Sequence, residues 1–288
     1  MLWRRAPAKI NLTLRVIGRR ADGWHEIESL VAFGGICDWL RFEPGPQLDL
    51  VVEGPTAVDV GPVERNLVLL AALALAARVP DLTLGRFRLI KRLPAAAGLG
   101  GGSADAAAAL RALVESNHLS FDDGRVRAAA METGADVPVC LCPRAQMMAG
   151  IGDRLGPVVP LPRIFAVLVN PRVATSTAQV FAALGLKPGS RFEVSGSPFL
   201  PPAPDEKLVL DSVASCCNDL EQAGRELVPA IGLVLERLSR SRGAKLTRMS
   251  GSGATCFALF NDRRNAATAL HAISAERPEW WTAATCLR

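Results

Sequence analysis

The chain has 288 residues, of which 49% are hydrophobic and 21% are charged, a composition typical of globular proteins and not of disordered ones. No apolar run approaches the ~20 residues that cross a bilayer, and the charged start of the chain has no apolar run behind it, so we expect a cytoplasmic protein with no membrane partner and no secretory signal. The net charge of +5 permits an anionic partner, but the basic residues form short scattered clusters, which favours a nucleotide-sized anion over a nucleic acid.

Strand and helix patterns mix in the first half of the chain. Apolar and polar residues alternate over residues 10–16, which predicts a half-buried strand that ends in the turn at residues 20–23. The Ala-rich segment 104–115 predicts a helix capped by Ser103, and Asp105 on its first turn is expected to stabilise the helix dipole. In chain order we expect strands at residues 10–16, 36–42, 48–52 and 87–89, and helices at residues 66–78 and 104–115.

The second half continues this mixture. Residues 221–239 have the apolar spacing of one long amphipathic helix, and a glycine turn at residues 250–253 separates two strand patterns. In chain order we expect strands at residues 164–169, 245–249, 256–260 and 282–287, and helices at residues 176–184, 221–239 and 262–275.

The order of these elements indicates the fold class. Strands and helices lack the regular βαβα alternation of a doubly wound sheet, which favours an α+β fold of two domains. The Pro- and Gly-rich tract 156–162 is the expected boundary, and it divides the chain into residues 1–158 and residues 159–288. A second such tract, residues 187–205, is expected to be a surface excursion of the C-terminal half.

A glycine-dense loop runs directly into a helix at residues 94–105, which read P-A-A-A-G-L-G-G-G-S-A-D. The first-turn amides of a helix have no intrahelical partner, and with the positive end of the helix dipole they form an anion site that glycine lets a phosphate approach closely. The loop is not a Walker A motif, because no Lys follows its last glycine, and no ~30-residue βαβ unit of a dinucleotide site surrounds it. A flexible connector capped by Ser103 is the alternative.

Residues 249–255, M-S-G-S-G-A-T, form a second glycine site between two expected strands. Alone, this segment is typical of a hairpin turn. The presence of two such loops in one chain favours the alternative that both face one polyphosphate.

The seven cysteines are an odd number, and none of their spacings gives the paired C-x-x-C sets of a zinc site. Two of them are adjacent and two others are two positions apart, which suits neither a shared tetrahedral metal nor an easy disulfide. We expect reduced, mostly buried thiols.

Taken together, the two glycine loops resemble those of the GHMP kinase superfamily, which uses a P-G-L-G-S/G-S-type loop instead of a Walker motif. Further blocks are similar to one family within it, the 4-diphosphocytidyl-2-C-methyl-D-erythritol kinases, and they follow in the same order over nearly the whole chain. The N-terminal block is not shared by mevalonate or homoserine kinases. The matching blocks are residues 6–12 (A-P-A-K-I-N-L), 18–26 (G-R-R-A-D-G-W-H-E), 98–107, 134–138 (G-A-D-V-P), 218–221 (N-D-L-E) and 251–254 (G-S-G-A).

This resemblance implies an enzyme of non-mevalonate isoprenoid biosynthesis, an ATP:alcohol phosphotransferase that acts on the 2-hydroxyl of 4-diphosphocytidyl-2-C-methyl-D-erythritol. It implies ATP as co-substrate, Mg²⁺ as the metal, a small cytidyl-diphosphate substrate as the partner, and no nucleic-acid partner. It also implies the superfamily's two-domain α+β fold with the active site in the cleft between domains. We expect a monomer or a weak dimer.

By position, Asp136 matches the catalytic base of the family and Lys9 matches its partner. An alcohol attacks phosphate poorly until a carboxylate accepts its proton, and a nearby ammonium can orient that carboxylate and offset phosphoryl charge. From the residues alone, Lys9 is one polar residue of a strand and Asp136 is a turn carboxylate.

The resemblance places the ATP phosphates on the first glycine loop and adenine beside the helix that begins at Asn66. The hydroxyl of Ser103 is the candidate that reaches Mg²⁺ on the phosphates. The candidate ATP-binding residues are Asn66, Pro94, Ala95, Ala96, Ala97, Gly98, Leu99, Gly100, Gly101, Gly102 and Ser103.

Trp24 and His25 match the positions at which the family binds the cytosine ring. A flat aromatic ring stacks on a base, and imidazole can form hydrogen bonds with its polar edge. The family commonly has Tyr at the stacking position, whereas this chain has Trp24 and no tyrosine at all. A core tryptophan beside a turn is the alternative. Asn11 and Thr177 match further substrate-contact regions.

Two other functions stay open from the sequence. A different kinase of the superfamily would act on mevalonate, a phosphomevalonate or homoserine, but those substrates bring no base to stack on Trp24. A non-catalytic RNA-binding module is the second alternative, because the superfamily's N-terminal fold resembles one of ribosomal proteins and the isoelectric point is near 9.0. Lys9 and Asp136 in matching blocks weigh against it.

Overall fold

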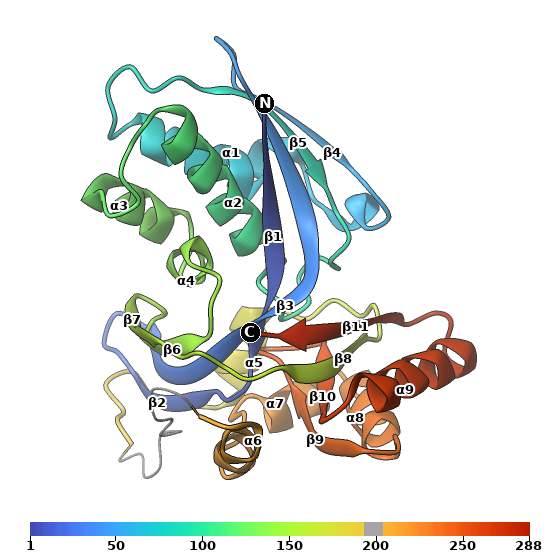
Figure 1. The fold of residues 1–288 in the computed structure, drawn as a ribbon. Coiled ribbons are helices and arrows are strands. Elements are labelled where there is room, and N and C mark those ends of the chain that lie inside the picture. Colours follow the sequence, from blue (N-terminus) through green and yellow to red (C-terminus); the bar gives the residue numbers. More distant parts are fainter. Residues whose placement is uncertain (193–203) are drawn as a thin grey trace. The chain divides into compact units, whose positions relative to one another are not determined.

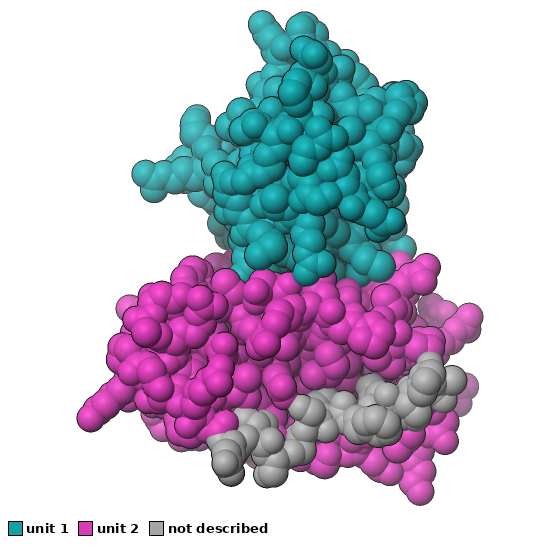
Figure 2. All heavy atoms as spheres, turned by 90° about the vertical axis from the view of Figure 1, so that its left-hand side faces the viewer, with its two compact units in different colours: residues 1–9, 37–95, 100–143 teal, residues 10–36, 96–99, 144–288 magenta. Residues whose placement is uncertain are grey.

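The computed structural model describes residues 1–192 and 204–288, and it confirms the predicted α+β class (Figure 1). The chain forms two compact units that interleave along the sequence (Figure 2). Unit 1 comprises residues 1–9, 37–95 and 100–143, and unit 2 comprises residues 10–36, 96–99 and 144–288. The sequence predicted one domain boundary, after residue 158, whereas each compact unit consists of several chain segments. The boundary stays a prediction.

Unit 1 places helices beside a small mixed sheet (Figure 1). Strand β5 pairs antiparallel with the second part of β3 and parallel with β4, while β1 pairs with β3. The Phe42 and Phe87 rings lie 4.7 Å apart in the core, and α1 packs against α2 and α3. The strands are β1 (Leu2–Asn11), β3 (His25–Pro44), β4 (Asp49–Glu53) and β5 (Gly85–Ile90), and the helices are α1 (Leu67–Ala76), α2 (Gly101–Ser116), α3 (Gly124–Thr133) and α4 (Val137–Leu141), with 3₁₀ turns η1 (Ala57–Asp59) and η2 (Val63–Arg65).

Unit 2 is built on an antiparallel run of strands in the order β11-β8-β10-β9, and every residue of β10 is buried. The first part of β3 pairs with β2 and β6, and β7 pairs with β6. The strands are β2 (Arg15–Arg19), β6 (Gln146–Gly150), β7 (Arg154–Val158), β8 (Ile164–Asn170), β9 (Ala244–Met249), β10 (Cys256–Phe260) and β11 (Trp281–Leu287). The helices are α5 (Thr177–Ala183), α6 (Glu206–Ala214), α7 (Glu221–Leu227), α8 (Ala230–Ser239) and α9 (Arg263–Glu276).

Three expectations about these elements were wrong. The strand at residues 10–16 is broken into β1 and β2, because the Thr13 hydroxyl accepts the Leu30 N–H and takes the place of a ladder bond. The helix at residues 221–239 is two helices, because Pro229 has no N–H and disfavours a helical conformation at Val228, which has φ of −132° and ψ of 84°. Helix α2 begins at Gly101 with Gly100 as its N-cap, so Ser103 lies inside the first turn and does not cap it.

Several expectations are confirmed within the described residues. The helices expected from residues 66, 176 and 262 are present as α1, α5 and α9, and in the structure Asn66, Ser176 and Asp262 cap them by accepting first-turn N–H groups. All seven cysteines are free, as expected, but only Cys37, Cys140 and Cys256 are buried, so the expectation that most are buried is wrong. Of the tract 187–205, residues 193–203 lie outside the described part of the chain. Within residues 1–192 and 204–288, no helix combines the length and the apolar character that a membrane crossing needs.

Candidate active site

Lys9 and Asp136, which lie 127 positions apart in the sequence, form an ion pair in unit 1. The Lys9 Nζ lies 3.0 Å from Asp136 Oδ1. Lys9 is on the buried end of β1 and its side chain is 4% exposed, whereas Asp136 is the N-cap residue of α4 and its side chain is 36% exposed. The carboxylate is therefore oriented by a buried cation and still reachable from solvent, which is what a general base needs.

Arg111 of α2 connects the two elements that carry this pair. Its guanidinium donates to the carbonyl of Arg5 on β1 at 2.6 Å and to the carbonyl of Cys140 on α4 at 2.5 Å. Burial lowers the pKa of Arg111 to about 10, so the group stays cationic at neutral pH. No sequence signal pointed to Arg111, because its partners are backbone carbonyls far away in the sequence.

The start of α2 has the geometry of an anion site. Gly100 is in the left-handed region, with φ of +59°, and no side chain of the described residues caps the helix there by a hydrogen bond. A Cβ on Gly100 would lie 3.1 Å from Cε of Lys9, so only glycine lets the loop pass this close to the lysine. The first-turn amides at residues 101–103 have no intrahelical acceptor, and they carry the positive end of the helix dipole.

In unit 2, the centre of the first glycine loop packs against the second glycine loop. Ser250 Oγ donates to the carbonyl of Gly98 at 2.9 Å, and the Thr255 N–H donates to the carbonyl of Ala97 at 3.1 Å. Gly98 has φ of +74°, and a Cβ there would lie 2.3 Å from the Ser250 carbonyl oxygen. The two loops predicted to share one polyphosphate are therefore in contact.

Asn218 holds the second loop in place, a role that the sequence did not reveal. Its Nδ2 donates to the carbonyls of Met249 and Gly251, both at 2.8 Å. The amide N–H of Asn11 donates to Ser250 Oγ at 3.1 Å, so this serine links the end of β1 to the first loop. Both residues lie in blocks quoted for the family resemblance, which was the available signal.

Trp24 is 56% exposed, so it is not a core residue, and the alternative of a buried tryptophan is wrong. The neighbouring His25 ring lies 4.7 Å from the ring of Phe181 on α5, at an interplanar angle of 31°. Burial, and then the positive charge of Arg19, lower the pKa of His25, and its Nε2 has no hydrogen-bond partner within the described residues. A neutral imidazole with one unused nitrogen is suited to the polar edge of a base. Phe181 was not predicted.

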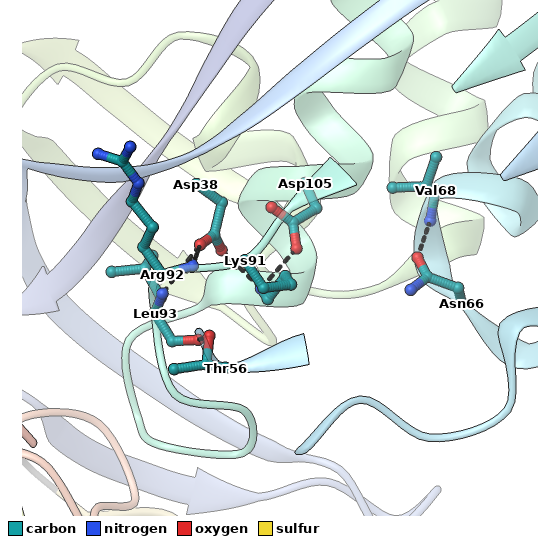
Figure 3. A network of polar contacts seen from close by, with 8 residues as sticks. All are labelled: Asp38, Thr56, Asn66, Val68, Lys91, Arg92, Leu93 and Asp105. Atoms are coloured by element: carbon teal, nitrogen blue, oxygen red, sulfur yellow. Dashed lines mark hydrogen bonds and ion pairs between the residues drawn. The ribbon is translucent and has the colours of Figure 1, made fainter. Parts of the chain in front are cut away.

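Three further candidate residues have partners inside the protein. Asn11 is 1% exposed, and its Nδ2 donates to Ser29 Oγ at 2.7 Å. The Thr177 hydroxyl lies 2.8 Å from Ser252 Oγ, which joins the exposed start of α5 to the second glycine loop. Asn66 accepts the Val68 N–H at 3.0 Å (Figure 3).

A cluster of three buried ionisable side chains lies next to the start of α2 in unit 1, and we call Lys91, Asp38 and Asp105 the Lys91 cluster (Figure 3). The Lys91 ammonium lies 2.5 Å from Asp38 Oδ2 and 2.7 Å from Asp105 Oδ2, and no member is more than 3% exposed. Burial, opposed by Lys91 and reinforced by Asp38, raises the pKa of Asp105 to about 8. Asp105 was expected only to stabilise the helix dipole, so the sequence missed its partners.

No group of three or more His, Cys, Asp or Glu side chains that could hold a metal ion occurs among the residues that the structure describes. A Mg²⁺ ion often has few protein ligands in phosphotransferases, because the phosphate oxygens and water complete its coordination. The residues present fit that arrangement, since Ser103 supplies a hydroxyl on the first turn of α2, beside the free amides.

Comparison with known proteins identifies relatives over the full chain. The family model "GHMP kinases N terminal domain" matches residues 66–144, and the model "GHMP kinases C terminal" matches residues 204–279. The 4-diphosphocytidyl-2-C-methyl-D-erythritol kinase of Methylobacterium radiotolerans is 53% identical, covering 100% of this chain and 99% of the relative. The protein of the same name from Rhodopseudomonas palustris strain CGA009 is 52% identical, covering 98% of this chain and 96% of the relative.

Solved structures agree with these relatives. A crystal structure of 4-(cytidine 5′-diphospho)-2C-methyl-D-erythritol kinase matches with a TM-score of 0.73 and 34% identity, covering 99% of both chains. A homoserine kinase from Cytophaga hutchinsonii matches with a TM-score of 0.69 at 19% identity, which concerns the fold alone. The predicted resemblance and the predicted two-domain α+β kinase fold are confirmed.

Proposed function

This chain belongs to the 4-diphosphocytidyl-2-C-methyl-D-erythritol kinase family of the GHMP kinases, and we propose on that premise that it transfers the γ-phosphate of ATP to the 2-hydroxyl of 4-diphosphocytidyl-2-C-methyl-D-erythritol. The observation that carries the proposal is the Lys9–Asp136 pair, which unites a buried ammonium and a reachable carboxylate at 3.0 Å. The reaction is a step of non-mevalonate isoprenoid precursor synthesis.

Asp136 is the group that accepts the proton of the attacking hydroxyl. Lys9 orients the carboxylate through their ion pair, and its positive charge offsets the charge that develops on the transferred phosphoryl group. In phosphoryl transfer most of the catalysis comes from such positioning and charge stabilisation. Arg111 keeps β1 and α4 together and so maintains the spacing of the pair.

The amides at the start of α2 bind the phosphates of ATP, and the contact between Gly98 and Ser250 fixes the shape of the loop that precedes them. Mg²⁺ bound on the phosphates would neutralise their charge, with the Ser103 hydroxyl as the protein's contribution to its coordination. Asn66, at the start of α1, is the candidate for the adenine side.

The cytosine ring of the substrate is proposed to stack on Trp24, with His25 on its polar edge. The exposed indole offers an aromatic face, and the neutral His25 has a buried Nε2 with no hydrogen-bond partner among the described residues. Phe181 supports the imidazole by ring contact and is a further candidate for the base site. Asn11 and Thr177 complete the proposed substrate side, and the enzyme is proposed to act in the cytoplasm as a monomer or weak dimer.

A coupled ADP-release assay with Mg²⁺ and a panel of alcohols tests the substrate. We expect turnover with 4-diphosphocytidyl-2-C-methyl-D-erythritol and none above background with mevalonate or homoserine. An Asp136→Asn sample measured in parallel shows how much ADP comes from a contaminating kinase. Turnover with mevalonate or homoserine alone would overturn the substrate assignment, and a thermal shift with RNA but not with ATP would overturn the kinase assignment.

Replacement of Trp24 tests the base site. If the indole stacks on cytosine, Trp24→Ala should weaken substrate binding by roughly 1–3 kcal/mol, the scale of base–aromatic stacking, while Trp24→Phe largely keeps it. This corresponds to about a 5- to 150-fold rise in KM for the cytidyl substrate, with KM for ATP unchanged. Trp3→Ala is the matched control. Trp3 is also an exposed tryptophan, but it lies in unit 1 and packs against Trp39, so its removal should leave KM for the cytidyl substrate unchanged. A Trp24→Ala enzyme with unchanged KM for the cytidyl substrate would place the cytosine elsewhere.

A further inference from the structure

The Lys91 cluster connects the two chain segments that flank the first glycine loop in unit 1 (Figure 3). Asp38 Oδ1 accepts the N–H groups of Arg92 at 2.5 Å and of Leu93 at 2.8 Å, and these residues lead directly into Pro94. Thr56 Oγ1 donates to the carbonyl of Leu93 at 2.9 Å and holds the same segment from another side. The chain that leads into the loop is therefore fixed by side chains.

The other end of the loop is fixed by the same lysine. Asp105 lies on the first turn of α2, and its Oδ2 accepts a hydrogen bond from Lys91 Nζ. A Cβ built on Gly101, the first residue of α2, would lie 3.6 Å from that Nζ and 3.7 Å from Cβ of Leu93. The ammonium is thus packed against the helix start whose amides are proposed to bind phosphate.

Stability alone is a poor reason for such a cluster. Taking charges out of water costs several kcal/mol per ion, and well-packed apolar side chains are often as stable as a buried ion pair. Charged hydrogen bonds also fix the direction and the spacing of the groups that they join. A site that must hold free amides in one geometry for a polyphosphate benefits from that precision.

We propose that the Lys91 cluster is a positioning site for ATP: it sets the spacing between residues 92–93 and the first turn of α2, and so holds the amides of residues 101–103 ready for the phosphates. Lys91, Asp38 and Asp105 are positioning residues in this inference, because they act through the backbone of the loop. The inference rests on the proposed function, since it names ATP as the ligand.

The two carboxylates of the cluster differ in a way that allows a matched test. Asp38 uses both oxygens, Oδ1 for the two backbone amides and Oδ2 for Lys91. Asp105 accepts from Lys91 at Oδ2, and its buried Oδ1 has no hydrogen-bond partner among the described residues. In Asp105→Asn the amide oxygen can take the place of Oδ2 and keep the link to Lys91. In Asp38→Asn one of the two links must be lost, because the new NH₂ group cannot accept a hydrogen bond.

Steady-state kinetics of the full chain with ATP, Mg²⁺ and the cytidyl substrate give the readout, with folding checked by circular dichroism. We expect Asp38→Asn to raise KM for ATP roughly tenfold and to leave KM for the cytidyl substrate within about twofold. Asp105→Asn should leave both KM values within about twofold, and Asp105→Ala, which cuts the link, should behave like Asp38→Asn. Should Asp38→Asn not fold, the Asn and Ala variants at position 105 provide the same contrast.

The outcomes separate this inference from simpler explanations. Both Asp→Asn changes replace one carboxyl group of the cluster by an amide of the same size, so equal effects on KM for ATP would mean that the loss of a carboxyl group or of stability acts and not positioning, and the inference would be overturned. An unchanged KM for ATP in folded Asp38→Asn would also overturn the positioning role of the Lys91 cluster. The proposed function would still stand in that case if the unmodified chain showed ATP-dependent turnover. An unmodified chain that does not bind ATP would overturn both.

Discussion

Asp136→Asn is expected to lower kcat by roughly 10²–10⁴-fold, the usual contribution of a general base, with little change in KM for either substrate. The amide keeps the size of the side chain and can still accept a hydrogen bond from Lys9, but it cannot take a proton from the substrate hydroxyl. The measurement is initial-rate kinetics at saturating ATP and cytidyl substrate. Lys9→Met should also lower kcat strongly, because it leaves the carboxylate of Asp136 without its buried ion partner.

The control for this variant is Asp122→Asn, an exposed aspartate of the same unit, which should leave kcat and both KM values unchanged. The melting temperature of each variant separates a loss of folded protein from a loss of chemistry. If Asp136→Asn retained most of its kcat in the folded state, proton acceptance would not limit the rate or Asp136 would not be the base.

The local elements were predictable where the sequence carried a local signal. Asn66 before an apolar run predicted the start of α1, and the short apolar run at residues 256–260 after a glycine turn predicted β10. The long helix at residues 221–239 failed although its signal was present, since Pro229 in the interior of a helix pattern usually breaks it. The strand break near Thr13 had no such signal, because it depends on a hydrogen bond to Leu30, 17 positions away.

The site was predictable only where the family resemblance reached. Lys9 and Asp136 are brought together by the fold, and no spacing rule connects two residues 127 positions apart. The Lys91 cluster and Arg111 were missed for the same reason, since their partners are distant carboxylates and backbone carbonyls. The start of α2 was predicted three residues too late, at residue 104 instead of 101, because a run of glycines disfavours a helix in isolation. Contacts made in the folded protein override that preference here.

Gly98→Ala is expected to lower kcat/KM for ATP by roughly 10²-fold, the cost of a misplacement of about 1 Å near a reacting group. The alanine would adopt a left-handed conformation at a cost of roughly 1–2 kcal/mol, and its Cβ would lie 2.3 Å from the Ser250 carbonyl oxygen and 2.8 Å from that of Gly253. Backbone atoms cannot move away as a flexible side chain can. The first glycine loop must therefore shift, which changes the conformation of the backbone that leads into α2.

Gly185→Ala provides the matched control in the same unit. Gly185 has φ of +65°, close to the +74° of Gly98, but a Cβ there would have no heavy atom of the described residues within 4 Å. Both variants therefore carry the same conformational strain, and only Gly98→Ala collides with the second glycine loop. We expect Gly185→Ala to lower the melting temperature slightly and to keep kcat/KM for ATP, so the difference between the two variants measures the loop contact. Equal and near-normal kinetics in both would mean that the contact between Gly98 and Ser250 does not shape the phosphate site.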